Sequence, residues 1–409
     1  MNYSYHTLEN GIKLIHKNTS SYVAHLGLIV NTGSRDEAID EQGIAHFIEH
    51  TIFKGTKKRK SYHILSSLEN VGGELNAFTS KEETCIHASF LNQYYQRTLE
   101  LFSDIFINSI FPDKEIKKEK DVVIEEINYY KDLPDENIFD DFEALLFKNH
   151  ALGRNILGLP SIIKTFNRKK IRKFIDANYN TDEVIICSVG NIDFNKLKAF
   201  AERYFSEIKS NLRTVKRKKF NNYKPFTVTL EKNTIQTHCI IGNLSFSYKD
   251  KRRTNMVLMN NLLGGPGMNT RLNIALREKH GISYNIESNF VPFSDTGIFN
   301  IYLGTDNHSI ERAIELVNKE LQLLREKKLG SLQLQRAKQQ LMGQIAISYE
   351  SNLTEMLSIG KSYLVYNKVD TLEQVYKEIE SITSVDIIEL ANQVFCKDKL
   401  STLIYKPAK

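Results

Sequence analysis

Two histidines one helical turn apart, with a glutamate between them, are the residues of this chain best suited to chemistry. They stand in the run His46-Phe47-Ile48-Glu49-His50. An α-helix advances about 100° per residue, so His46, Glu49 and His50 share a polar face, and Phe47 and Ile48 lie on an apolar one. Two imidazoles at i and i+4 can direct ring nitrogens to one metal ion. Chance gives about 0.04 such matches in a chain of this composition. The pattern therefore predicts a metal site, on a helix over residues 43–53 with Asp40 as its N-cap.

A third metal ligand is expected on the charged helix over residues 114–130. A catalytic zinc site uses three protein ligands and keeps a fourth position open for water. Glu126 shares a face with the apolar Ile127, whereas Glu125 lies on the charged face. Helical periodicity therefore favours Glu126 as the ligand. Glu119, two turns earlier on the same face, can accept a hydrogen bond from a ligand histidine.

These residues resemble the pitrilysin or insulinase-like metallopeptidases, and most closely the short branch that is similar to mitochondrial processing peptidase. The resemblance covers nearly the whole chain and includes HFIEHTIFKGT, GGELNAFTSKEET and EKDVVIEEI. H-x-x-E-H is the reversed zinc motif. The resemblance implies one zinc ion per chain, held by His46, His50 and Glu126. It also implies that Glu119 supports the site and that Glu49 is the general base.

A predicted edge strand follows the turn at Gly72-Gly73. The unpaired backbone of an edge strand can accept a peptide as an additional strand. In the family this strand binds the main chain of the substrate, and the matching positions here are Asn76, Ala77 and Phe78.

The second half of the chain offers two further substrate-binding residues. Arg277 and Tyr284 match the arginine and tyrosine that reach the substrate carbonyl in the family, and both can donate to a developing oxyanion. The glycine-rich run over residues 264–267 lacks the G-K-[ST] of a phosphate-binding loop, which disfavours a nucleotide site.

Strand-like and helical segments follow the same order in both halves of the chain. This order predicts an α+β fold of two related domains, each a mainly antiparallel sheet packed with helices. The resemblance implies the same type, that of LuxS and the processing peptidases. The expected divisions are a catalytic zinc-binding domain (1–209), a basic linker (210–225) and a substrate-holding domain without a metal site (226–409). A solvated connector is the favoured interpretation of the linker, and a site for an anionic partner is the other.

Composition narrows the possible partners and compartment. The net charge of +6 among 104 charged residues is too weak a bias for a nucleic-acid-binding protein. Four dispersed cysteines form no C-x-x-C motif and fit a reducing compartment. Since no signal peptide, transit peptide or membrane-spanning run is recognisable, we expect a cytoplasmic protein without a membrane partner.

The sequence thus predicts a zinc-dependent metalloendopeptidase that hydrolyses short or unfolded peptides. In the family four such domains enclose a chamber, so a chain of two domains implies a homodimer, or a heterodimer with a related chain. One alternative is a non-catalytic partner or scaffold subunit of a processing-peptidase-like complex, which the complete ligand set disfavours. Another is an iron enzyme that uses two histidines and one carboxylate, which the glutamate between the histidines disfavours.

Overall fold

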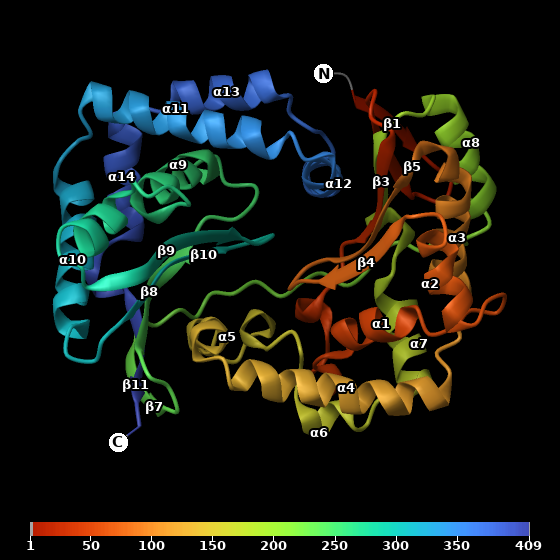
Figure 1. Ribbon diagram of the computed structural model, residues 1–409, viewed down its shortest axis with the longest axis horizontal. Helices are drawn as coiled ribbons and strands as arrows, with labels where there is room; N and C mark the ends of the chain where they lie inside the picture. The colour runs from red at the N-terminus through yellow and green to blue at the C-terminus, as the bar shows by residue number, and fades with distance from the viewer. Residues whose placement is uncertain (1–2, 409) are drawn as a thin grey trace. The chain divides into compact units, whose positions relative to one another are not determined.

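The computed structural model describes residues 3–408 and consists of two compact units, each built around one β-sheet (Figure 1). The first unit comprises residues up to 127, residues 154–218 and residues 347–369. The second comprises residues 128–153, 219–346 and the chain from 370 onward. This two-sheet arrangement of strands and helices confirms the predicted fold class.

The first sheet is antiparallel except for one parallel pair, β2 with β6. Its strands lie in the order β1 (Tyr3–Thr7), β2 (Lys13–Asn18), β6 (Val184–Gly190), β3 (Val23–Val30), β5 (Thr84–Leu91) and β4 (Glu74–Thr79). β4 is therefore an edge strand, paired with β5 on one side only.

The second sheet repeats this arrangement. Its strands lie in the order β7 (Thr227–Lys232), β11 (Ser401–Pro407), β8 (Thr237–Ser245), β10 (Gly297–Thr305) and β9 (Ser283–Pro292). The pair β7 and β11 is parallel, and the other pairs are antiparallel. The order β7, β11, β8, β10, β9 in this sheet corresponds to the order β2, β6, β3, β5, β4 in the first. The two halves therefore share strand order and direction. This shared topology confirms that the halves are related.

Helices pack on both faces of each sheet. In the first unit one face shares a core with α1 (Ile44–Ile52), α2 (Ser61–Glu69), α3 (Tyr95–Asn108), α4 (Asp113–Lys131), α6 (Pro160–Ile163), α7 (Arg168–Asn178) and α8 (Phe194–Phe205). In the second unit the corresponding core contains α9 (Arg253–Gly264), α10 (Ile310–Glu326), α11 (Ser331–Ser348), α13 (Leu372–Ser381) and α14 (Ser384–Val394).

The remaining faces are covered by helices from the opposite half of the sequence. α12 (Asn352–Tyr366) packs on β2, β3 and β6 of the first sheet, and α5 (Pro134–Leu146) packs on β8 and β11 of the second. The compact units therefore depart from the predicted division at 210–225 in these two helices. The reason is physical, since an amphipathic helix shows in its sequence that it has an apolar face but not which sheet that face will cover.

A buried ion pair fixes α12 to the first sheet. Lys17 Nζ of β2 lies 2.6 and 2.5 Å from the two carboxylate oxygens of Glu355, whose side chain has no exposed surface. Removing one partner of a buried pair leaves the other charge uncompensated.

We expect Glu355→Met to lower the free energy of unfolding by about 3 kcal/mol, measured by urea denaturation. The matched control is Glu115→Gln in the exposed Glu115–Lys118 pair of α4, for which we expect a change below about 0.5 kcal/mol. Equal small changes in both variants would show that this pair does not hold α12.

None of the helices formed by residues 3–408 combines the length and apolar character that crossing a bilayer requires.

Candidate metal centre

Helix α1 carries the histidine pair and confirms the predicted helix. Its apolar residues Ile44, Phe47, Ile48 and Ile52 are buried in the core of the first unit. His46 is buried as well, while Glu49 and His50 are half-buried. The polar face of the helix is thus turned toward α4 and β4. The predicted N-cap, Asp40, is wrong, because Gly43 is the N-cap of this helix.

The three predicted ligands come together from α1 and α4. Glu126 Oε2 lies 3.7 Å from His46 Nε2 and 3.4 Å from His50 Nε2. One ligand atom from each of the three residues can be chosen so that all lie within 4.8 Å of one another. Within residues 3–408 this is the one cluster of three or more histidine, cysteine, aspartate or glutamate side chains with such spacing.

These separations fit a tetrahedral zinc ion. Ligand atoms about 2.0–2.2 Å from such an ion are about 3.3–3.6 Å apart. The Nε2 atoms of both histidines face the same buried oxygen of Glu126. Two imidazoles and one carboxylate are also a donor set that zinc accepts.

Without a metal ion the cluster shares protons unevenly. Burial and the neighbouring His50 lower the pKa of His46 to about 4. Burial would also lower the pKa of His50, but hydrogen bonding and charge from Glu119 and Glu126 outweigh it and raise that pKa to about 9. The hydrogen bond from His50 in turn holds the pKa of Glu126 below its usual range. A histidine must be neutral to bind a metal ion, so metal binding would compete with protonation of His50.

Glu119 lies behind His50, as predicted for a supporting residue. Its Oε2 is 3.3 Å from His50 Nδ1, the ring nitrogen that points away from Glu126. Its other oxygen is 2.7 Å from Lys54 Nζ, so the carboxylate is fixed from two sides. Lys54 was not predicted, because it follows the end of α1 at Ile52 and helical periodicity therefore does not place it.

The faces of α4 are as predicted. Glu119 is buried and Glu126 half-buried, whereas Glu125 is exposed.

We expect Glu126→Gln to weaken metal binding strongly, because it removes a ligand. Loss of a residue that only supports a ligand costs about 10–100-fold in metal affinity, and this loss should be larger. Glu125→Gln is the matched control and should leave binding unchanged. Metal-to-protein ratios after dialysis give the result, and equal loss from both variants would show that Glu126 is not a ligand.

Glu49 lies between the histidines on the side of α1 that packs beside β4. Its Oε2 is buried and accepts no hydrogen bond from the described residues. Burial raises the pKa of this carboxyl above its ordinary value, against an opposing effect of the Thr79 hydroxyl. A carboxylate with a raised pKa and an unused oxygen is well prepared to accept a proton.

The strand β4 contains all three predicted peptide-binding positions. Asn76 is exposed, and Ala77 and Phe78 are half-buried. Ala77 and Glu49 line the same small cavity, so the strand runs directly beside the candidate base. Because β5 is the one described strand that pairs with β4, the backbone of the other edge of β4 is available for pairing with an extended peptide.

Known proteins with similar sequences decide the family. Residues 13–159 match the family described as Insulinase (Peptidase family M16), and residues 165–341 match the one described as Peptidase M16 inactive domain. The zinc protease YmxG of Bacillus subtilis is 33% identical over 403 residues, which cover 98% of this chain and 97% of that protein. This chain belongs to the insulinase family, M16.

One further relative and two solved structures are similar to this chain over most of its length. The β subunit of the mitochondrial-processing peptidase of Saccharomyces cerevisiae is 28% identical over 403 residues, which cover 94% of this chain and 87% of that protein. A protease from Helicobacter pylori has the same fold, with a TM-score of 0.91 at 23% identity over 99% of this chain and all of the other. An M16 inactive domain from Pseudomonas fluorescens gives a TM-score of 0.93 at 20% identity over 100% and 98%.

The residues that the M16 resemblance assigned to the second half lie in the second unit. Arg277 belongs to a π-helical turn (Asn273–Glu278), and Tyr284 to the edge strand β9. The guanidinium of Arg277 stacks over the Tyr284 ring at 4.8 Å, and the tyrosine is 81% exposed. Tyr284 is therefore a surface residue and not a core residue, whereas Arg277 is half-buried.

The basic segment over residues 210–225 is not simply a solvated connector. Lys216 and Lys219 are exposed, as expected. However, Arg213 and Arg217 form ion pairs with the carboxylate of Asp36, at 2.5 and 2.8 Å. Their partner lies more than 170 residues away in the sequence, so no local pattern could have shown it.

Proposed function

We propose that this M16 chain is a zinc metalloendopeptidase that hydrolyses short or unfolded peptides. The observation that carries the proposal is the convergence of His46, His50 and Glu126 beside the unpaired oxygen of Glu49, next to an edge strand that can bind a peptide. The names of relatives such as YmxG support the same chemistry.

The predicted site residues of the first unit would each have a role in this reaction. Asn76, Ala77 and Phe78 would align the peptide as an additional strand. A bound zinc ion would polarise the scissile carbonyl and lower the pKa of the attacking water. Glu49 would accept the proton of the attacking water and pass it to the leaving amine. Glu119 would keep the His50 ring in the orientation and tautomer that a ligand needs.

Arg277 and Tyr284 would contribute from the second unit. A guanidinium and a phenol can donate hydrogen bonds to the oxyanion that forms on the scissile carbonyl. The exposure of Tyr284 supports this role, since its hydroxyl is accessible to a bound peptide.

We further propose that two copies of this chain assemble, so that four related sheets surround the peptide. A heterodimer with a related chain is the other arrangement, and the name of the yeast relative, a subunit, keeps it open. The description of residues 165–341 as an inactive domain keeps a non-catalytic partner subunit as the second candidate function.

Elemental analysis of the purified protein tests the metal assignment. One zinc per chain supports the proposal, whereas one iron per chain favours oxygen chemistry.

A second experiment tests the substrate class. It offers the enzyme one substrate protein in two forms, folded, and unfolded by reduction and carboxymethylation. Cleavage of the unfolded form only supports the proposed substrate class, and equal cleavage of both forms contradicts it.

A further inference from the structure

The start of helix α1 is held by a side chain outside the helix. Gly43 at its N-cap has no side chain to cap the helix. Instead Glu37 accepts hydrogen bonds from the backbone N–H of Gly43 at 2.9 Å and of Ala45 at 3.0 Å. These are groups that a helix start leaves without an internal partner. Since Ala45 directly precedes His46, Glu37 fixes the backbone beside the first predicted ligand.

The backbone around this contact has little room to move. Gly43 has a φ of 90°, and a Cβ placed there would lie 2.6 Å from the carbonyl oxygen of Leu157. Glu37 is only 5% exposed, and its own carbonyl accepts a hydrogen bond from Arg154 Nη1 at 2.6 Å. The loop that carries Glu37 is therefore part of the packed structure around α1.

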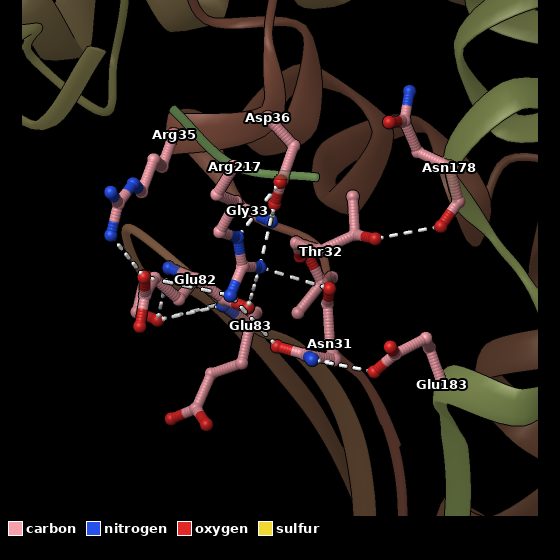
Figure 2. A network of polar contacts seen from close by, with 12 residues as sticks. Asn31, Thr32, Gly33, Arg35, Asp36, Glu82, Glu83, Asn178, Glu183 and Arg217 are labelled. Atoms are coloured by element: carbon pink, nitrogen blue, oxygen red, sulfur yellow. Dashed lines mark hydrogen bonds and ion pairs between the residues drawn. The ribbon is translucent and has the colours of Figure 1, made fainter. Parts of the chain in front are cut away.

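Asp36, the residue before Glu37, is bound by two arginines of the basic segment over residues 210–225. Arg217 donates from Nε to Asp36 Oδ1 at 2.9 Å and from Nη2 to Asp36 Oδ2 at 2.8 Å, a bidentate pair (Figure 2). Arg213 Nη2 lies 2.5 Å from the same Oδ1. The side chains of Asp36 and Arg217 are 3% and 11% exposed. Such a planar, buried pair restrains both position and orientation.

Arg217 is itself anchored on the sheet. Its Nη2 donates to the carbonyl oxygens of Asn31, directly after β3, at 3.0 Å and of Glu82, between β4 and β5, at 2.9 Å (Figure 2). The guanidinium therefore connects the loop before α1 to the ends of the strands on which that helix packs.

We propose that Arg217 is a positioning residue of the metal centre, acting through Asp36 and Glu37 on the N-terminal end of α1. The basic segment then has a function beyond connecting the halves, because it fixes the helix that carries His46 and His50. The proposal rests on the proposed metal centre, but not on peptide hydrolysis.

The test measures Co²⁺ binding to the full chain, with the absorption spectrum of bound Co²⁺ as a report on ligand geometry. Arg217→Lys keeps the charge but loses the bidentate contact. We expect it to raise the Co²⁺ dissociation constant about 10–100-fold and to change the spectrum. Lys216→Gln, an exposed neighbour in the same segment, is the matched control and should match the wild type.

A double variant tests the route of the effect. If Arg217 acts through Glu37, Arg217→Lys should add little to the loss that Glu37→Gln alone causes. Additive losses would overturn the proposed route. Unchanged Co²⁺ binding and spectrum in Arg217→Lys, even with a lower melting temperature, would show a merely structural role and overturn the proposal.

Asp36→Asn carries the same test if Glu37→Gln does not fold. A loss of Co²⁺ affinity in Asp36→Asn supports the proposal, and unchanged affinity contradicts it. Because neither readout requires catalysis, a chain that binds Co²⁺ but cleaves no peptide would contradict the proposed function and leave this inference standing.

Discussion

Replacing Glu49 with glutamine is expected to lower the rate of peptide hydrolysis about 10²–10⁴-fold while the protein keeps its metal. The amide fills the same space between the histidines, but it cannot accept the proton of the attacking water. The loss should appear in kcat, measured with a fluorogenic peptide, and zinc content should stay at one per chain.

Glu69→Gln provides a matched control, since this exposed glutamate ends helix α2, which carries none of the predicted site residues. Its activity should equal that of the wild type. A Glu49→Gln protein with full activity, purified free of wild-type enzyme, would show that another group is the base.

Tyr284→Phe is expected to reduce kcat about 10²–10³-fold with little change in KM. The substitution removes one hydroxyl that would donate to the oxyanion, and this donor matters most when charge develops on the carbonyl oxygen. Since Tyr284 is exposed, the fold and the metal content should survive the change.

Tyr22→Phe is the control for this variant, because Tyr22 is another highly exposed tyrosine, directly before β3 in the first unit. It should leave both kinetic constants unchanged. If Tyr284→Phe also left kcat and kcat/KM unchanged, Tyr284 would have no part in the reaction.

The parts of the site that lie within single helices could be predicted from the sequence. One turn of α1 places His46 and His50 on the same face, and the period of α4 separates Glu126 from Glu125. The edge position of β4 could also be anticipated, because a strand-like run directly follows the glycine turn at Gly72-Gly73.

The long-range contacts could not be predicted in the same way. Neither the pairing of Arg217 with Asp36 nor the docking of α12 on the first sheet leaves a periodic signal, since each joins segments far apart in the chain. The missed cap has the same origin, because Glu37 reaches Gly43 and Ala45 across a loop rather than from the N-cap position. Such contacts depend on tertiary packing, which overrides local preference.

The most direct test of a zinc-dependent peptidase is hydrolysis of a peptide library by the purified chain before chelation, after chelation and after zinc is restored. Mass spectrometry identifies the cleaved bonds, and elemental analysis gives the zinc content at each stage. We predict cleavage that is lost with zinc, returns when one zinc per chain is restored, and is absent throughout in Glu49→Gln. A chain that holds one zinc in the wild-type form and still cleaves no peptide would contradict the account and favour a non-catalytic partner subunit.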